Sequence, residues 1–249
     1  MDTHSSTADF DRDGFVLFRR FLGRDTVDEI IRRLNDFIAN VVPTMPREHV
    51  FCEDVGDIRT LKQLQRLFDY DPFFHSLMFD SDFEKLASTL LRHDVVGMNM
   101  QYFNKPAQIG KPTPAHQDGY YFMLEPNEAI TMWLALDDVD EENGCVRYIP
   151  GSHRNGLRNH ARTQTLGFSQ GIVDYSDQDA AQEIAIPAQP GDLLAHHALT
   201  IHRADGNSSS NRSRRAIGFI YYSTAAKESD EKATRQQQLE SDLRSSGKI

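Results

Sequence analysis

Apolar positions in the first third of the chain follow a helical period. A short apolar run at 14–18 predicts one early strand. Apolar residues then recur every three or four positions from 27 to 41, a stripe that predicts a helix with Asp25 as its N-cap and Pro43 just beyond its end. The following residues, 44–57, show no period and are expected to form a loop.

Two shorter helices are expected next, at 58–68 and 82–93, so residues 1–94 form a helix-rich part. The pattern changes at Val95. From there, short β-rich runs alternate with clusters of Pro, Gly, Asn and Asp, which favours an antiparallel sandwich or barrel over alternating strands and helices. The expected strands are 95–104, 131–136, 146–149, 183–186, 193–197 and 216–223.

Length and composition indicate one globular domain. The 249 residues are 39% apolar and 26% charged, which is ordinary for a folded protein, and a β domain of this size commonly forms a single unit. We therefore expect one domain over 1–226, consisting of the helix-rich part and a β core at 95–226. Residues 227–249 are charged and Gln-rich and are expected to form an exposed helix or a frayed tail.

Charge and cysteine content exclude several functions. The formal net charge of −10 argues against nucleic acid or an anionic membrane surface as the main partner. Two cysteines are too few for a disulfide framework or a Cys-rich zinc site. We see no signal peptide and no apolar run long enough to span a membrane, so a cytoplasmic location is expected.

A histidine and an aspartate two positions apart, His116 and Asp118, are the first candidates for metal ligands. In an extended strand, such residues point to the same face. With a distant second histidine, they would complete the two-histidine, one-carboxylate set that leaves one face of an iron(II) ion open. The pair alone is weak evidence, because His-x-Asp recurs by chance in many proteins.

Three histidines downstream compete for the third position, namely His196, His197 and His202. In an unbroken strand, His196 and His202 share one face and His197 points to the other, so parity does not choose between the first two. We expect His196 and His197 to be core residues or partners of the ligands. His153 and His160 lie among polar residues and are expected to be exposed.

A basic pair, Arg214 and Arg215, opens the last predicted strand. A guanidinium can bind a carboxylate through two parallel hydrogen bonds, as a 2-oxo acid bound at the metal would require. The alternative to this binding role is a pair of surface charges at the start of a strand. This alternative is less favoured because the following residues are strongly apolar.

Taken together, these segments resemble the phytanoyl-CoA dioxygenase family of Fe(II)/2-oxoglutarate oxygenases. The resemblance runs from Asp13 to Tyr222 through several ordered blocks, namely Asn104-Lys-Pro, His116-Gln-Asp, Trp133-Leu-Ala-Leu-Asp-Asp-Val, Glu142-Asn-Gly-Cys-Val-Arg-Tyr-Ile-Pro-Gly-Ser-His, Gly191-Asp-Leu-Leu, His202 and Arg214-Arg-Ala-Ile. It implies a double-stranded β-helix, or jelly-roll, core with flanking helices, and an enzyme that uses iron(II), 2-oxoglutarate and O2.

The resemblance also implies roles for individual residues. His116, Asp118 and His202 would bind iron, and Arg214, rather than Arg215, would bind the 2-oxoglutarate carboxylate. Lys105 and Trp133 would line the same pocket, with Thr131 on the Trp133 face as a hydrogen-bond donor. The chain departs from relatives that carry Gly-Ser after the distal histidine, since it has Arg203-Ala204 there. The missing hydroxyl contact is expected from Ser213 or Thr200.

The resemblance implies hydroxylation of a C–H bond with release of succinate and CO2. The compact length favours a small polar metabolite, for example an aminophosphonate or an amino-acid-like compound. Candidate substrate contacts are Gln101, Gln117, Tyr120 and Tyr121, and the 44–57 loop is a candidate lid. Two alternatives are a non-catalytic protein that binds metal or metabolite and a zinc hydrolase with the same ligands. The sequence does not indicate the oligomeric state.

Overall fold

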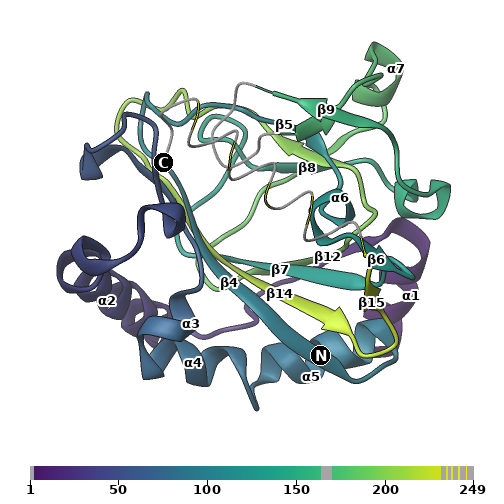
Figure 1. Ribbon diagram of the computed structural model, residues 1–249, viewed down its shortest axis with the longest axis horizontal. Coiled ribbons are helices and arrows are strands. Elements are labelled where there is room, and N and C mark those ends of the chain that lie inside the picture. The colour runs from purple at the N-terminus through teal and green to yellow at the C-terminus, as the bar shows by residue number, and fades with distance from the viewer. Residues whose placement is uncertain are drawn as a thin grey trace.

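Two antiparallel sheets form the centre of the molecule (Figure 1). The computed structural model describes residues 3–163 and 170–230, together with the single positions 234, 237, 241 and 245. In the larger sheet the strands follow the order β1 (Phe15–Phe18), β12 (Leu193–His197), β7 (Ala129–Ala135), β14 (Arg214–Ser223), β4 (Val95–Lys105), β3 (Leu61–Leu64) and β2 (Val50–Cys52).

The smaller sheet lies across from the larger one (Figure 1). Its order is β11 (Ile184–Ile186), β8 (Val146–Tyr148), β13 (His202–Ala204) and β5 (Thr113–His116). Two further strand pairs complete the β structure. They are β9 (His160–Arg162) with β10 (Gln170–Ile172), and β6 (Leu124–Glu125) with β15 (Lys227–Glu228).

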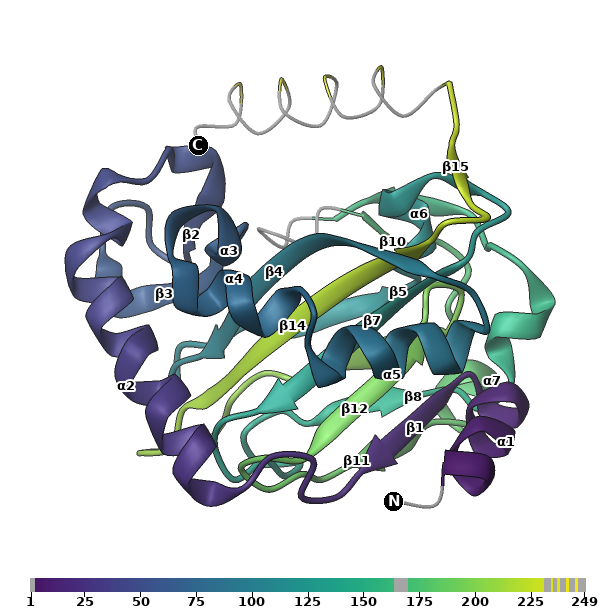
Figure 2. The same ribbon diagram turned by 90° about the horizontal axis from the view of Figure 1, so that it is seen from below.

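Helices cover the outer face of the larger sheet, as Figure 2 shows for α2, α4 and α5. The α-helices are α1 (Thr3–Asp13), α2 (Arg24–Asn40), α3 (Leu67–Tyr70), α4 (Pro72–Met78), α5 (Asp82–Leu91), α6 (Gly119–Phe122) and α7 (Asp177–Ala180). Short 3₁₀ helices lie at Val42–Thr44, Arg47–His49, Ile58–Thr60 and Ser152–Asn155.

Side-chain alternation along the central strands separates the core from the cavity. On β7, Met132 and Leu134 belong to the apolar core that also contains buried residues of the covering helices, such as Leu34 and Phe74. At the alternate positions, Thr131 and Trp133 point the other way and line a cavity between the sheets. The outer and inner faces are both buried, so β7 has no exposed position, as expected for a strand in the middle of a layered fold.

The strand at 14–18, the helix ended near Pro43, the helix at 82–93 and the six later strands are confirmed within a few residues. The N-cap prediction is wrong, because Gly23 takes that position and Asp25 lies in the first turn. The loop at 44–57 contains a 3₁₀ turn and β2. The predicted helix at 58–68 is instead β3 between two short helices, since pairing with β2 and β4 overrides local propensity.

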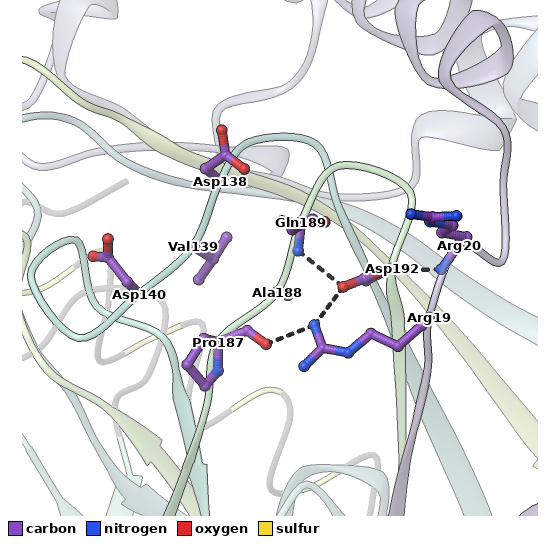
Figure 3. A pocket seen from close by; sticks show the side chains of 9 residues that line it. All are labelled: Arg19, Arg20, Asp138, Val139, Asp140, Pro187, Ala188, Gln189 and Asp192. Atoms are coloured by element: carbon purple, nitrogen blue, oxygen red, sulfur yellow. Dashed lines mark hydrogen bonds and ion pairs between the residues drawn. The ribbon is translucent and has the colours of Figure 1, made fainter.

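Asp192, in the turn before β12, lines a pocket with Arg19 and Gln189 (Figure 3), and this pocket shares no lining residue with the cavity between the sheets. Gly191 has a φ of +91°, and a Cβ there would lie 2.4 Å from the Leu22 carbonyl oxygen, so a side chain does not fit. The buried Asp192 carboxylate accepts hydrogen bonds from the backbone N–H groups of Arg20 and Gln189 and from the Arg19 guanidinium. This block of the resemblance therefore has a structural role.

The first residues of the predicted tail form a strand on the surface of the domain. β15 pairs with β6, and the Ser229 N–H donates to the Met123 carbonyl, so ordered pairing extends past residue 226. Most of 231–249 lies outside the described residues. In the part of the chain that is described, no helix combines the length and apolar character needed to cross a bilayer.

Candidate metal and cosubstrate site

Three potential ligands come together at the edge of the smaller sheet. His116 on β5 and His202 on β13 are direct partners in the antiparallel register. One ligand atom from each of His116, Asp118 and His202 lies within 4.8 Å of the others. Asp118 Oδ1 lies 3.4 Å from His116 Nε2 and 3.7 Å from His202 Nε2. This is the only such group among the described residues.

His116 and Asp118 come together through a different backbone conformation from the predicted one. The strand does not continue through Asp118, because β5 ends at His116 and Asp118 has helical φ and ψ values at the start of α6. The shared face of an extended strand is therefore the wrong explanation. A sharp turn after His116 brings the carboxylate back towards the imidazole.

Backbone carbonyls fix the tautomer of both histidines. His116 Nδ1 lies 2.8 Å from the Pro114 carbonyl oxygen, and His202 Nδ1 lies 3.0 Å from that of Thr200. A carbonyl only accepts, so each Nδ1 must carry the proton, and each Nε2 presents a lone pair next to Asp118. Burial, with His116 and His196 nearby, holds the pKa of His202 well below its usual value, which keeps the ring neutral.

Asp118 is oriented by two donors on one of its oxygens. Oδ2 accepts from the Thr131 hydroxyl at 2.6 Å and from His196 Nε2 at 3.1 Å. Because His196 Nε2 donates, its Nδ1 must accept, and the Tyr148 hydroxyl donates to it over 2.9 Å. This chain of contacts, from Tyr148 through His196 to Asp118, leaves Oδ1 directed at the two Nε2 atoms.

Charge at Asp118 is stabilised by the same surroundings. Burial alone would raise the pKa of Asp118, but the hydrogen bond from His196 opposes this effect, and the pKa lies well below its usual range. The carboxylate is thus ionised at neutral pH.

Among the other histidines, His196 contacts Asp118, as expected for a partner of the ligands, and His197 lies on the other side of β12, where its Nδ1 accepts from the Leu199 N–H. The prediction that His153 and His160 are exposed is wrong, because both are half-buried. His160 Nε2 accepts from the Gln117 N–H and its ring stacks on Tyr120 at 4.4 Å.

The three ligands face a cavity of about 740 Å³ between the sheets. Arg214 and Lys105, both buried, line the same cavity. The Arg214 guanidinium lies 5.3 Å from the centre of the Trp133 ring, and its Nε has no hydrogen-bond partner among the described residues. Burial lowers the pKa of Arg214 to about 10. No ion pair joins Arg214 to a carboxylate among the described residues, and a buried cation in this state is suited to an anionic ligand.

The neighbouring Arg215 has a different environment. Its guanidinium binds both oxygens of Asp137, with contacts of 2.7 Å and 3.0 Å, on the outside of the cavity. Hydrogen bonding to Asp137 raises the pKa of Arg215. Alternation along β14 therefore gives one arginine to the cavity and the other to a salt bridge.

Lys105, Thr131 and Thr200 make contacts that modify their predicted roles. Lys105 Nζ donates to the Lys111 carbonyl at 2.5 Å and lies 3.3 Å from the Thr113 hydroxyl. Burial, followed by repulsion from Arg214, lowers the pKa of Lys105 well below its usual value. The Thr131 hydroxyl is used by Asp118. The Thr200 hydroxyl donates to the Gly14 carbonyl and does not line the cavity, and neither does Ser213.

The structure separates the four candidate substrate residues into two pairs. Gln101 and Tyr121 line the cavity, with the Tyr121 ring 6.3 Å from that of His116. Gln117 is buried and does not line it, since its amide donates to the carbonyls of Gly156 and Leu199 and accepts from the Arg158 N–H. Tyr120 also lies outside the lining and stacks on His160. Substrate contact by Gln101 and Tyr121 therefore stays a prediction that their position fits, and contact by Gln117 and Tyr120 stays a prediction without such a position.

Sequence reasoning missed the Tyr148 hydroxyl and the residues of the first third that reach the cavity, among them Gln63, Gln65, Arg66 and Phe51. The segment at 61–66, Leu-Lys-Gln-Leu-Gln-Arg, is mostly polar, and this pattern also fits a surface helix. His49 does line the cavity, in agreement with the proposed proximity of the 44–57 segment to the site.

The two antiparallel sheets, with a His-Asp-His group that could hold a metal ion at the edge of one of them, place this protein among the jelly-roll proteins. The family model "Phytanoyl-CoA dioxygenase (PhyH)" matches residues 10–216, and the chain belongs to this family. A phytanoyl-CoA dioxygenase of Arabidopsis thaliana is 29% identical over 84% of this chain and 85% of its own length. The human peroxisomal phytanoyl-CoA dioxygenase is 30% identical over 60% of this chain, and this match spans 46% of the human protein.

Solved structures share the fold. The epimerase SnoN, in complex with Fe3+, alpha ketoglutarate and nogalamycin RO, aligns with a TM-score of 0.71 at 22% identity over 90% of this chain and 84% of that one. Apo EctD from S. alaskensis aligns with a TM-score of 0.74 at 18% identity over 92% and 79%. The jelly-roll fold and the class of iron- and 2-oxoglutarate-dependent dioxygenase are thereby confirmed.

Proposed function

We propose that this chain hydroxylates a C–H bond of a small polar molecule, with His116, Asp118 and His202 as its iron(II) ligands. The observation that carries the proposal is the convergence of two lone-pair-bearing Nε2 atoms and one carboxylate oxygen at a cavity that also holds an uncompensated guanidinium. Two imidazoles and one carboxylate on one side of an ion suit non-haem iron and leave positions for other ligands.

The residues present fit both cofactor and cosubstrate. Asp118 offers Oδ1 because Oδ2 is occupied by Thr131 and His196. Arg214 gives its part of the cavity a positive charge that suits the distal carboxylate of 2-oxoglutarate, and the Lys105 side chain lines the same cavity. Bound iron with 2-oxoglutarate supplies oxygen activation, coupled to release of succinate and CO2.

The remaining work of the protein is positional. Carbonyls of Pro114 and Thr200 hold the imidazole rings, and Thr131 with His196 holds the carboxylate. The rings of His116 and His202 are buried at the cavity between the two sheets. A substrate in the remaining volume is held with one C–H bond next to the open side of the ligand set.

The proposal is tested with purified protein, iron(II) and 2-oxoglutarate. Anaerobic binding is followed by absorption of the iron–2-oxoglutarate complex, and succinate is measured after oxygen is admitted. We expect binding and succinate release by the native chain, and neither by His116→Ala or Asp118→Ala. Binding without succinate would favour a non-catalytic protein, and activity with zinc in place of iron would favour a hydrolase.

A further inference from the structure

The cavity extends beyond the metal and cosubstrate residues to a wall built from β3 and β4. Gln63 on β3 is the register partner of Phe103 on β4 and lies next to the Gln101 position on the same inner face. Asn99 and Gln65 line the same part of the cavity. We call Gln63, Gln65, Asn99 and Gln101 the amide wall.

Gln63 carries an unmet hydrogen-bonding requirement. Its side chain lines the cavity and the residue is only 2% exposed, yet its Oε1 has no hydrogen-bond partner among the described residues. A buried acceptor without a donor destabilises the fold, so such groups are uncommon unless a ligand satisfies them. Asn99 differs, because its Oδ1 accepts from the Arg66 N–H at 3.0 Å.

The cations beside the amide wall are already paired. Arg66 Nε contacts Asp69 at 2.5 Å, and Lys62 Nζ contacts the buried Glu53 at 3.2 Å. Burial, with Arg66 nearby, lowers the pKa of His49, which leaves that ring neutral at pH 7. Glu48 and Glu228, which also line the cavity, are exposed. An anion placed here would meet no free positive charge, in contrast to the Arg214 end.

An apolar and aromatic wall bounds the cavity on another side. Phe122 and Tyr222 lie with ring centres 5.1 Å apart, and Met98 and Ile220 extend the same cluster. Tyr121, next in the chain to Phe122, lies near His116. A ligand that bridges the two walls needs an apolar face for the rings and neutral hydrogen-bonding groups for the amides.

We infer that the prime substrate is a small neutral molecule with an apolar ring or face and amide or hydroxyl groups, which Gln63 and Gln101 recognise, and is not an acyl-CoA thioester. This inference rests on the proposed function, because it concerns the same cavity. A glutamine amide pairs with both a donor and an acceptor, and therefore selects amides and hydroxyls over carboxylates or hydrocarbon chains.

Three matched probes on one ring test the inference, namely cyclohexanecarboxamide, cyclohexanecarboxylate and cyclohexanecarboxyl-CoA. Binding to the protein loaded with zinc and 2-oxoglutarate is measured by saturation-transfer NMR. We expect the carboxamide to bind about tenfold more tightly than the other two, as one or two hydrogen bonds would give. Equal or tighter binding of the carboxylate or the thioester overturns the inference.

Variants assign the preference to the amide wall. Gln63→Leu and Gln101→Leu should each reduce carboxamide affinity about tenfold, whereas Gln178→Leu, on the exposed surface of α7, should not. Since Gln63→Leu removes an unsatisfied acceptor, its melting temperature should be unchanged or higher. A large fall in melting temperature, or retained carboxamide selectivity in both variants, means that the wall is structural and overturns the inference. Failure of the native chain to bind 2-oxoglutarate counts instead against the proposed function.

Discussion

Two regions of the inter-sheet cavity, one around Asp118 and one around Arg214 and Gln63, differ in how far the protein itself supplies hydrogen-bond partners. Around Asp118 the groups that orient the carboxylate have partners within the protein, because Thr131 and His196 donate to it and Tyr148 donates to His196. At Arg214 and at Gln63, buried nitrogen or oxygen atoms have no partner among the described residues. The difference indicates that the ligand set is pre-organised by the fold, whereas the other groups await ligands that supply their hydrogen bonds.

Removal of the ligand carboxylate should have the largest effect. Asp118→Ala eliminates one of three ligands, so we expect iron(II) affinity to fall by more than about a hundredfold, beyond the range seen when only supporting groups are lost. Competition with a chelator measures this affinity. Asp138→Ala, an exposed carboxylate outside the cavity, is the matched control. Near-normal affinity in Asp118→Ala would show that the metal binds elsewhere.

Loss of Arg214 should weaken the binding of 2-oxoglutarate and leave the binding of iron(II) unchanged. Arg214→Leu should raise the KM for 2-oxoglutarate about a hundredfold, because two charge-assisted hydrogen bonds are lost, while iron(II) affinity is kept. Its melting temperature without ligand should not fall, since a buried unpaired cation is removed. Arg215→Leu is the control and should alter the KM little but lower the melting temperature. The reverse pattern would exchange the roles of the two arginines.

Loss of the groups that hold Asp118 should give an intermediate effect. His196→Leu should lower iron(II) affinity about tenfold to a hundredfold, because the carboxylate can rotate and present Oδ2 as well as Oδ1. Thr131→Val, which keeps the side-chain shape, should cost about tenfold, whereas Thr131→Ser should restore much of the affinity. If Thr131→Ser and Thr131→Val behave alike, the hydroxyl does not orient the carboxylate.

Stability at acid pH should depend on His197, a residue that does not line the cavity. Burial, with His153 and His196 nearby, lowers the pKa of His197 to about 4. The unfolded chain takes up this proton near pH 6.5 and the folded chain only near pH 4, so stability is full above 6.5 and falls between those values, by at most about 3 kcal/mol. Urea unfolding across this range should show a shallower decline for His197→Asn. An unchanged slope would contradict the assignment.

Periodicity and residue chemistry were sufficient for much of this molecule. Short β-rich runs after Val95 predicted the strands, even the three-residue β8 and β11, because clusters of Pro, Gly, Asn and Asp separate them. The ligand residues were identifiable because two histidines and an aspartate are chemically distinctive, and several ordered blocks supported the family resemblance. The prediction failed at 58–68, because Leu61 and Leu64 have a helical spacing, whereas pairing with β2 and β4 stabilises β3 as a strand.

The sequence by itself determined the family, the antiparallel class of the fold and the residue types available for a metal. Strand parity left the choice between His196 and His202 open, and the resemblance favoured His202. Only the tertiary structure shows how the two differ, because His196 Nε2 contacts Asp118 Oδ2 and His202 Nε2 lies 3.7 Å from Oδ1. It likewise separated Arg214 from Arg215 and brought Gln63 from the first third of the chain to the cavity. These outcomes depend on contacts between residues distant in sequence, which local patterns do not encode.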